Sequence, residues 1–302
     1  MKRLLLLFQI VCWSILSVNG QNNNEEIRII AIGAHPDDTD IRFGGTAALF
    51  AEMGHKVKFL AITSGDAGHQ NIGGGALARI RRNEANKAGE ILGVEYEVLS
   101  NHDAELTPEL HIRHDIIRKI REWEADIVVT HRPVDYHPDH RNTAILVQDA
   151  AYLVIVPNVV PDTPPLDANP LFIYVEDHFQ KPNPFKKDIA VIIDDVIEKK
   201  IDAMSAHNTQ MFEWLPWTRG ISLEEIPRDS QGKKKLLENE LKRRFPEKKA
   251  FDEEGVQAIR KWYSFSSFNR INHVEFFEIC EYGRKPTEAE ITKLFPMLKT
   301  KK

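Results

Sequence analysis

The sequence has few cysteines, which limits what can hold the fold together. Only Cys12 and Cys280 occur among the 302 residues. Cys12 lies in an amino-terminal segment that we expect to be removed, and Cys280 would then have no intramolecular partner. A disulfide framework is therefore excluded for the mature chain, so the fold must depend on its hydrophobic core.

An excess of basic residues is also missing. The chain has 40 Lys and Arg against 45 Asp and Glu, and removal of Lys2 and Arg3 with the leader would leave 38 basic against 45 acidic residues. Proteins that bind phosphate backbones normally present a net basic face, so we expect no nucleic-acid partner. The remaining composition, 42% hydrophobic and 28% charged, is that of an ordinary globular protein.

Long hydrophobic runs are absent beyond the first residues. The chain opens with MKRLLLLFQIVCWSILSVNGQ, in which a basic start precedes an apolar stretch and small residues. This pattern predicts a signal peptide over residues 1–20, cleaved after Gly20, and an exported protein that is periplasmic or secreted. The alternative is a retained anchor, but the run is short and contains Gln9 and Ser14, whereas a spanning helix needs about 20 mostly apolar residues. No membrane span is expected in the mature chain.

A glycine-rich phosphate-binding turn is missing from the place where a dinucleotide enzyme needs it. The first apolar segment, IRIIAIG at residues 27–33, leads into AHPDD, and the three glycines at 73–75 follow a different element. Because the pyrophosphate is held by the turn after the first strand, this sequence does not predict a dinucleotide site.

From residue 27 onwards, short apolar segments alternate with amphipathic helical patterns. Such alternation is typical of successive βαβ units with a parallel sheet covered on both faces. We predict an α/β fold, a Rossmann-like three-layer α/β/α sandwich with a mostly parallel sheet, as a single domain over residues 21–302. The predicted strands are 27–33, 56–63, 95–100, 126–131, 171–176, 188–194 and 273–282, and the predicted helices are 45–54, 76–93, 108–123, 139–154, one ending near 207, and 287–296.

Residues 211–262 differ in character from the rest of the chain. Trp214 and Trp217 are followed by a strongly charged stretch, GKKKLLENELKRRFPEKK. Two interpretations stay open. The segment is either a solvated helical excursion or a rim or lid over the site, in which the two indoles stack on the apolar face of a sugar.

Two loops carry residues suited to metal chemistry. AHPDDTD follows the strand at 27–33, and RPVDYHPDH follows the strand at 126–131. In a parallel sheet the loops after the strands converge at one edge, where the reactive site is expected. Pro36 stiffens the turn between His35 and Asp38, so that both side chains can face one point. An imidazole and a carboxylate are ligands of an open catalytic zinc site.

The second loop can complete a set of two histidines and one carboxylate. Proline favours the first helical position, so Pro138 is expected to put His137 at a helix cap and His140 in the first turn. Either histidine can be the third ligand, and Asp37 would be free to act as general base. Each motif alone is commonly a turn or a cap, and it is their pairing at two strand ends that predicts a metal site. Two histidines and a carboxylate suit Fe(II) as well as Zn²⁺.

These segments resemble the zinc-dependent de-N-acetylases of the LmbE-like family, which includes N-acetylglucosaminyl-phosphatidylinositol de-N-acetylase (PIG-L). The resemblance covers about residues 27–154, returns near 199–210 and at VEFFEICEYG, and is weak elsewhere. The matching segments are GAHPDDTDIRFGGT, TSGDAG, ARIRRNEANKAGEILGV, HDAEL and HPDH. In one departure, Thr39 stands where the familiar motif has Glu after the two aspartates, and Asp40 follows it.

The resemblance implies roles for five residues of the two loops. It implies that His35, Asp38 and His140 bind Zn²⁺. It further implies that Asp37 is the general base and that His137 stabilises the oxyanion or donates a proton.

Four further residues are candidates for substrate binding. The resemblance suggests that Arg81 and Asp103 hold polar groups of the substrate, although a surface charge and a turn residue are the plain alternatives. Tyr136, next to the second loop's histidine, is a candidate for assisting at the carbonyl or for simple packing. His207 is a candidate for approaching the site from a later helix, or for a core or capping role.

The expected activity is zinc-dependent hydrolysis of an N-acetyl group on an amino sugar or glycoconjugate, which yields acetate and a free amine. One alternative is an amidase for a thiol-sugar conjugate or another acylated amine, which export disfavours. The other is a non-catalytic, exported glycan-binding protein with a structural metal, in which Asp37 would have no binding duty. The sequence gives neither the sugar nor the oligomeric state.

Overall fold

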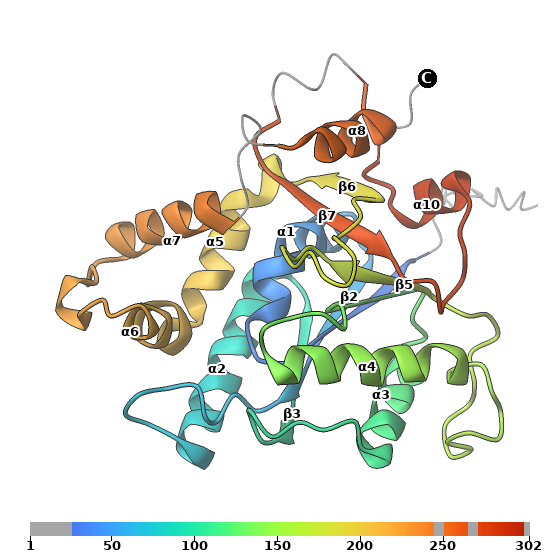
Figure 1. Cartoon of the computed structure of the whole chain (residues 1–302), viewed down its shortest axis with the longest axis horizontal. Helices are drawn as coiled ribbons and strands as arrows, with labels where there is room; N and C mark the ends of the chain where they lie inside the picture. The colour runs from blue at the N-terminus through green and yellow to red at the C-terminus, as the bar shows by residue number, and fades with distance from the viewer. Residues whose placement is uncertain (1–25, 245–250, 265–270, 299–302) are drawn as a thin grey trace, which may run out of the picture.

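The computed structural model describes residues 26–244, 251–264 and 271–298, which form a seven-stranded sheet with helices on both faces (Figure 1). The predicted signal segment, residues 1–20, lies outside the described residues. The strands are β1 (Arg28–Gly33), β2 (Lys56–Thr63), β3 (Glu95–Asn101), β4 (Ile127–Thr130), β5 (Leu171–Val175), β6 (Ile189–Ile192) and β7 (Val274–Ile279). The helices are α1 (Asp38–Glu52), α2 (Gly74–Leu92), α3 (Leu110–Glu122), α4 (Pro138–Leu153), η1 (Asp194–Val196), α5 (Ile197–Ala206), η2 (Thr209–Trp214), α6 (Leu215–Thr218), η3 (Leu223–Glu225), α7 (Ser230–Arg244), α8 (Glu253–Trp262) and α10 (Glu288–Leu294).

The sheet has the order β3-β2-β1-β4-β5-β7-β6. β1 to β5 pair in parallel, and β7 runs antiparallel to both of its neighbours. Helices α1, α2 and α5 contact one another on one face, and α3 and α4 pack together on the other (Figure 1). The predicted three-layer α/β/α sandwich with a mostly parallel sheet is therefore confirmed.

Burial explains why the central strands are continuous apolar runs. Every residue of β4 and of β5 is buried, because helices cover both faces of the sheet there. β3, at the edge, has only partly buried and exposed residues.

The strand order creates the place where a site is expected. The chain moves outward from β1 through β2 to β3, then returns to the other side of β1 as β4. The loops after β1 and β4 therefore leave adjacent strands in opposite directions and open a crevice between them. These are the two loops that carry AHPDD and HPDH.

Helix α1 begins at Asp38, seven residues before the predicted start. Gly44 and Gly45 are weak helix formers, so local propensity does not favour a helix through these positions. The structure accounts for a glycine at position 45, since a Cβ there would lie 2.7 Å from Ile193 Cδ1. Glu275 also accepts hydrogen bonds from the backbone of residues 45 and 46, at 2.9 and 2.8 Å. The helix thus starts within the AHPDD motif itself.

Residues 211–262 are mostly helical in their described part, and some of their side chains are buried. α7 packs against α5, and a second apolar cluster joins this segment to α1 and α5. Its buried members are Ile41, Ile201, Met204, Met211, Phe212, Ile226, Leu237 and Leu241. None of the helices in the described residues is long and apolar enough to cross a bilayer.

Candidate metal centre and active-site cavity

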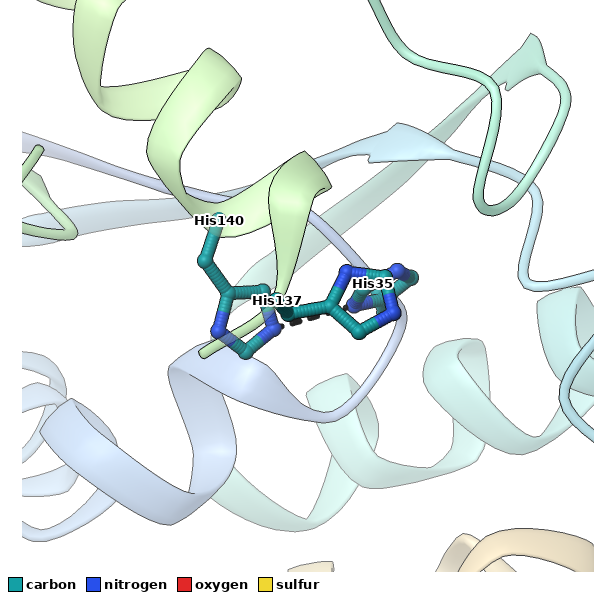
Figure 2. A group of neighbouring side chains, drawn as sticks. All are labelled: His35, His137 and His140. Atoms are coloured by element: carbon teal, nitrogen blue, oxygen red, sulfur yellow. Dashed lines mark hydrogen bonds between the residues drawn. The ribbon is translucent and has the colours of Figure 1, made fainter. Parts of the chain in front are cut away.

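Three histidine side chains converge at the crevice between β1 and β4. Figure 2 shows His35, from the loop after β1, facing His137 and His140 at the start of α4. His137 is the N-cap of α4, Pro138 is its first residue, and His140 lies in the first turn. This is the local structure that the HPDH spacing predicted.

The atoms of the predicted ligand set lie at mutual distances that suit a metal. His35 Nδ1 is 3.2 Å from His140 Nε2 and 3.4 Å from Asp38 Oδ2. His140 Nε2 is 3.3 Å from Asp38 Oδ1. Ligands at 2.0–2.1 Å from a tetrahedral zinc ion lie about 3.3 Å apart, so these three side chains, with Asp38 acting through either oxygen, suit one ion and leave a position open.

Carboxylates outside this set orient the two histidines. His35 Nε2 lies 3.0 Å from Asp103 Oδ1 and 3.3 Å from Asp139 Oδ2. His140 Nδ1 lies 3.0 Å from Asp135 Oδ1. A ring that gives its other N–H to a carboxylate keeps a lone pair for a metal, as is usual for metal-binding histidines.

The charges around the set favour a cation. Burial lowers the pKa of His140, but Asp38 and Asp135 outweigh it and raise that pKa to about 9. Burial would raise the pKa of Asp38, yet His140 and His131 hold it well below its usual range. A site that stabilises positive charge on its histidines in this way suits a divalent ion.

Other groupings of donors share residues with this one, and one of them includes His131. His131 lies near Asp38 and His140, and its ring stacks on His140 at 4.3 Å. Its Nε2 accepts a hydrogen bond from Ala34 N at 3.2 Å. The nitrogen that faces Asp38 is thus already used, so His131 fits a supporting position better than a ligand position.

Asp37 lies beside the set in an unusual backbone conformation. Its φ of 147° is one that non-glycine residues rarely adopt, and such strain commonly occurs at functional sites. The side chain is buried and lines the cavity. Burial and the neighbouring Asp38 raise the pKa of Asp37 to about 6, against the opposing effects of His207 and Arg81. Such a carboxyl group can take up and return a proton near neutral pH.

The cap position of His137 fixes its tautomer. His137 Nδ1 accepts a hydrogen bond from Asp139 N at 3.2 Å. In a neutral ring the proton must then lie on Nε2, which makes that atom a donor. Burial, with His35 and His140, lowers the pKa of His137. The residue therefore needs no positive charge to donate a hydrogen bond.

A cavity of about 210 Å³ opens over these residues. Of the predicted substrate-binding residues, Arg81, Asp103 and Tyr136 line it. Asp103 also supports His35, and Tyr136 is 71% exposed at the cavity mouth. The full lining is His35, Pro36, Asp37, Asp38, Ile41, Arg42, Gly65, Ala67, Gly68, Arg81, Asp103, Ala104, Tyr136, His137, His140, Gln210, Trp214 and Leu215.

His207 does not reach the cavity, which corrects its prediction as a substrate contact. Its side chain has no solvent exposure, and its Nε2 lies 3.2 Å from Asp40 Oδ2. It follows α5 directly, and its ring is directed at α1 behind the cavity. The alternative core role is the one that the structure supports.

The sequence reasoning missed three residues of the site. His131, Asp135 and Asp139 lie in or next to the loop after β4, so the strand-end rule that selected HPDH could have included them. Trp214, which the sequence offered as part of a rim over the site, lines the cavity from the divergent segment.

The chain is similar to known proteins in both sequence and fold. The family model for GlcNAc-PI de-N-acetylase matches residues 30–151. The chain is 31% identical over 216 residues to diacetylchitobiose deacetylase of Thermococcus kodakarensis, covering 66% of this chain and 78% of that protein. Its structure resembles that of N,N'-diacetylchitobiose deacetylase from Pyrococcus horikoshii, with a TM-score of 0.61 and 24% identity over 85% of each chain. At 24% identity, this structural similarity shows the fold alone.

A relative with another reaction is also found. The chain is 25% identical over 205 residues to 4-oxalmesaconate hydratase of Pseudomonas putida, covering 65% of this chain and 79% of that protein. A hydratase adds water across a double bond and releases no acetate. The sequence relatives of this chain therefore include both a deacetylase and a hydratase.

Proposed function

Because the chain belongs to the PIG-L, or LmbE-like, family of deacetylases, we propose that it is a metal-dependent hydrolase that removes the acetyl group from the nitrogen of an amino sugar or glycoconjugate. The observation that carries the proposal is the convergence of His35, Asp38 and His140 on one point, 3.2 to 3.4 Å from one another, with Asp37 beside them in the cavity.

His35, Asp38 and His140 would hold the metal, which we propose to be Zn²⁺, with Fe²⁺ as the alternative. A divalent ion supplies Lewis acidity, which polarises an acyl carbonyl and lowers the pKa of water. Asp103, Asp139 and Asp135 orient the two histidine rings toward it.

The chain's own residues account for the proton transfers. Asp37 takes a proton from the attacking water as the new C–O bond forms. His137 Nε2–H donates to the carbonyl oxygen as negative charge develops there, a contact typically worth about 3 to 4 kcal/mol. The C–N bond then breaks, and Asp37 returns its proton to the leaving amine. The products are acetate and a free amine.

The rest of the cavity suits a polyhydroxylated substrate. Arg81 and Asp103 offer a donor and an acceptor at its wall, and Tyr136 offers a hydroxyl at its mouth. An amidase acting on a thiol-sugar conjugate would use the same atoms, so the choice of amino sugar rests on the deacetylase relative. Export of the protein stays a prediction from residues 1–20.

The test is acetate release by purified protein of measured metal content. The substrates are N-acetylglucosamine, its short oligomers and a panel of N-acylated glycoconjugates, with and without a chelator. Asp37→Asn keeps the size of the side chain and removes the base, and Asp167→Asn, at an exposed position, is the matched control. We expect Asp37→Asn to retain the metal but lose at least about a hundredfold in kcat, and the control to match the parent.

The outcomes separate the alternatives. Full activity in Asp37→Asn would contradict the mechanism. Release of a different acid would move the proposal to another acyl group. Tightly bound metal with no acid released, together with hydration of an unsaturated dicarboxylate, would replace the deacetylase with a hydratase. Metal and glycan binding without any turnover would favour the binding-protein alternative.

A further inference from the structure

Two tryptophans form a stacked pair that extends from the cavity to solvent. The ring centroids of Trp214 and Trp217 are 5.2 Å apart, and the ring planes differ by 17°. Trp214 lines the cavity, and Trp217 is 50% exposed. The two residues are three positions apart at the junction of η2 and α6, a spacing that brings side chains together on one helical face.

The segment that carries this pair is fixed to the wall of the cavity. Glu84 of α2 accepts hydrogen bonds from Thr209 N and Thr209 Oγ1, at 2.8 and 2.7 Å. Glu213 lies 3.0 Å from His69 Nε2, in the loop after β2. η2 is a π-helix, an uncommon element that is frequent at functional sites. The indoles are thus held in place before any ligand arrives, which lowers the entropic cost of binding.

Polar groups converge at the foot of the pair. A methyl group added at Gly68 would lie 3.4 Å from Asp103 Oδ2, 3.6 Å from Trp214 Nε1 and 3.8 Å from Arg81 Nη2. A carboxylate, an indole N–H and a guanidinium therefore surround a space that glycine leaves open. Arg81 is 2% exposed, and its Nε has no hydrogen-bond partner among the described residues. Arg81 thus lines the cavity with one donor unused, while its Nη2 donates to Gly68 O at 2.7 Å.

We propose that the Trp214–Trp217 pair is a subsite for a second sugar unit. The acetylated sugar occupies the cavity against Trp214, Arg81 and Asp103, and the next sugar lies on the exposed face of Trp217. This inference rests on the proposed function and deepens it, since it names an N-acetylated amino sugar linked to a further sugar as the preferred substrate.

A sugar fits these features better than an apolar partner does. A pyranose ring has an apolar face that packs on an indole and a rim of hydroxyls that needs donors and acceptors. The pair is continuous with a cavity whose wall supplies both. A second copy of the chain could also cover Trp217, because Ile221 and Leu223, at 38% and 39% exposed, belong to the same segment. The test therefore includes the oligomeric state.

Calorimetric titration in an Asp37→Asn background measures binding without turnover. The ligands are N-acetylglucosamine and N,N'-diacetylchitobiose, titrated into that protein and into versions that also carry Trp217→Ala, Trp217→Phe or Tyr282→Ala. Tyr282, which is 58% exposed, is the control because it lies far from the site. The nearby Arg284 N donates to Pro170 O, which precedes β5, so Tyr282 is near the strand ends opposite to those that carry the site.

We expect the disaccharide to bind at least about tenfold more tightly than the monosaccharide, roughly the effect of one aromatic contact. Trp217→Ala should remove this gain, Trp217→Phe should keep most of it, and Tyr282→Ala should keep all of it. Equal binding of the two sugars, or a gain that survives Trp217→Ala, would overturn the inference. A change of oligomeric state in Trp217→Ala without a change in sugar affinity would assign the pair to self-association and overturn it as well.

The same protein with Asp37 intact separates this inference from the proposed function. If it binds the disaccharide preferentially through Trp217 but releases no acetate, the subsite stands and the deacetylase proposal fails. If it deacetylates both sugars with equal kcat/KM, the deacetylase stands and the subsite fails.

Discussion

His207 Nε2 lies 3.2 Å from Asp40 Oδ2, and neither side chain is exposed to solvent. Tyr96 OH donates to the same carboxylate oxygen at 2.9 Å. Burial lowers the pKa of His207, but Asp40 outweighs it and raises that pKa overall. Asp40 follows the metal-ligand candidate Asp38 by two residues in the first turn of α1. This buried pair therefore ties the later helix to the turn that presents the site.

His207→Ala should lower the free energy of unfolding by about 3 to 5 kcal/mol, because it leaves a buried carboxylate without its cationic partner. Denaturant unfolding of the metal-free protein measures this. The double variant Asp40→Asn/His207→Ala should be less destabilised than the sum of the two single variants, since both remove the same pair. Additive effects would show that the two residues act independently.

Asp135→Asn should weaken metal binding about 10- to 100-fold, because His140 would lose the carboxylate that orients its ring. Competition with a chelator of known affinity measures the change. Asp115→Asn, on the exposed side of α3, is the matched control and should bind the metal as the parent does. Unchanged affinity in Asp135→Asn would mean that His140 does not present Nε2 to the ion.

The sequence predicted the site to the extent that strand order and local spacing determine it. AHPDD and HPDH each follow a buried parallel strand, and a parallel sheet brings such strand ends together. Single polar residues gave no comparable signal. Asp135 and His131 follow the same strand as HPDH but belong to no motif, and the structure shows that they lie beside His140 and Asp38.

The sequence pattern predicted neither the direction of the His207 side chain nor the residue at which α1 starts. The pattern predicted a helix ending near His207 but not which way its ring would turn, and tertiary contact with Asp40 decided that. Within α1, Glu275 accepts hydrogen bonds from the backbone of residues 45 and 46, although it is more than 200 residues away in sequence. No local rule includes such a contact.

Arg121→Lys should lower the free energy of unfolding by about 3 kcal/mol or more. The buried Arg121 guanidinium donates to six main-chain carbonyls at the end of α4 and in the loop that follows. A lysine has three donors and no planar fork, so several buried carbonyls would lose their partners. Arg118→Lys, in the same helix but in partly exposed ion pairs, is the control and should change stability by less than about 1 kcal/mol. Equal effects of the two substitutions would contradict this role for Arg121.

Glu176 should make stability fall as pH rises. Burial raises the pKa of Glu176 to about 7, and Lys187 and Arg42 offset only part of this. An acid whose pKa is higher in the folded state binds its proton more tightly there. Its contribution is thus complete below the unfolded pKa of about 4.3 and is lost as pH rises to about 7.

The measurement is the free energy of unfolding of the parent and of Glu176→Gln at several pH values from 4.5 to 8. Relative to Glu176→Gln, the parent should lose at most about 3 kcal/mol of unfolding free energy between pH 4.5 and 7. Above pH 7 the difference between the two proteins should be flat. Glu90→Gln, at an exposed position in α2, should run parallel to the parent at every pH. If Glu176→Gln also runs parallel to the parent, Glu176 is ionised in the folded protein throughout this range, and its contact with Lys187, 3.8 Å away, outweighs its burial.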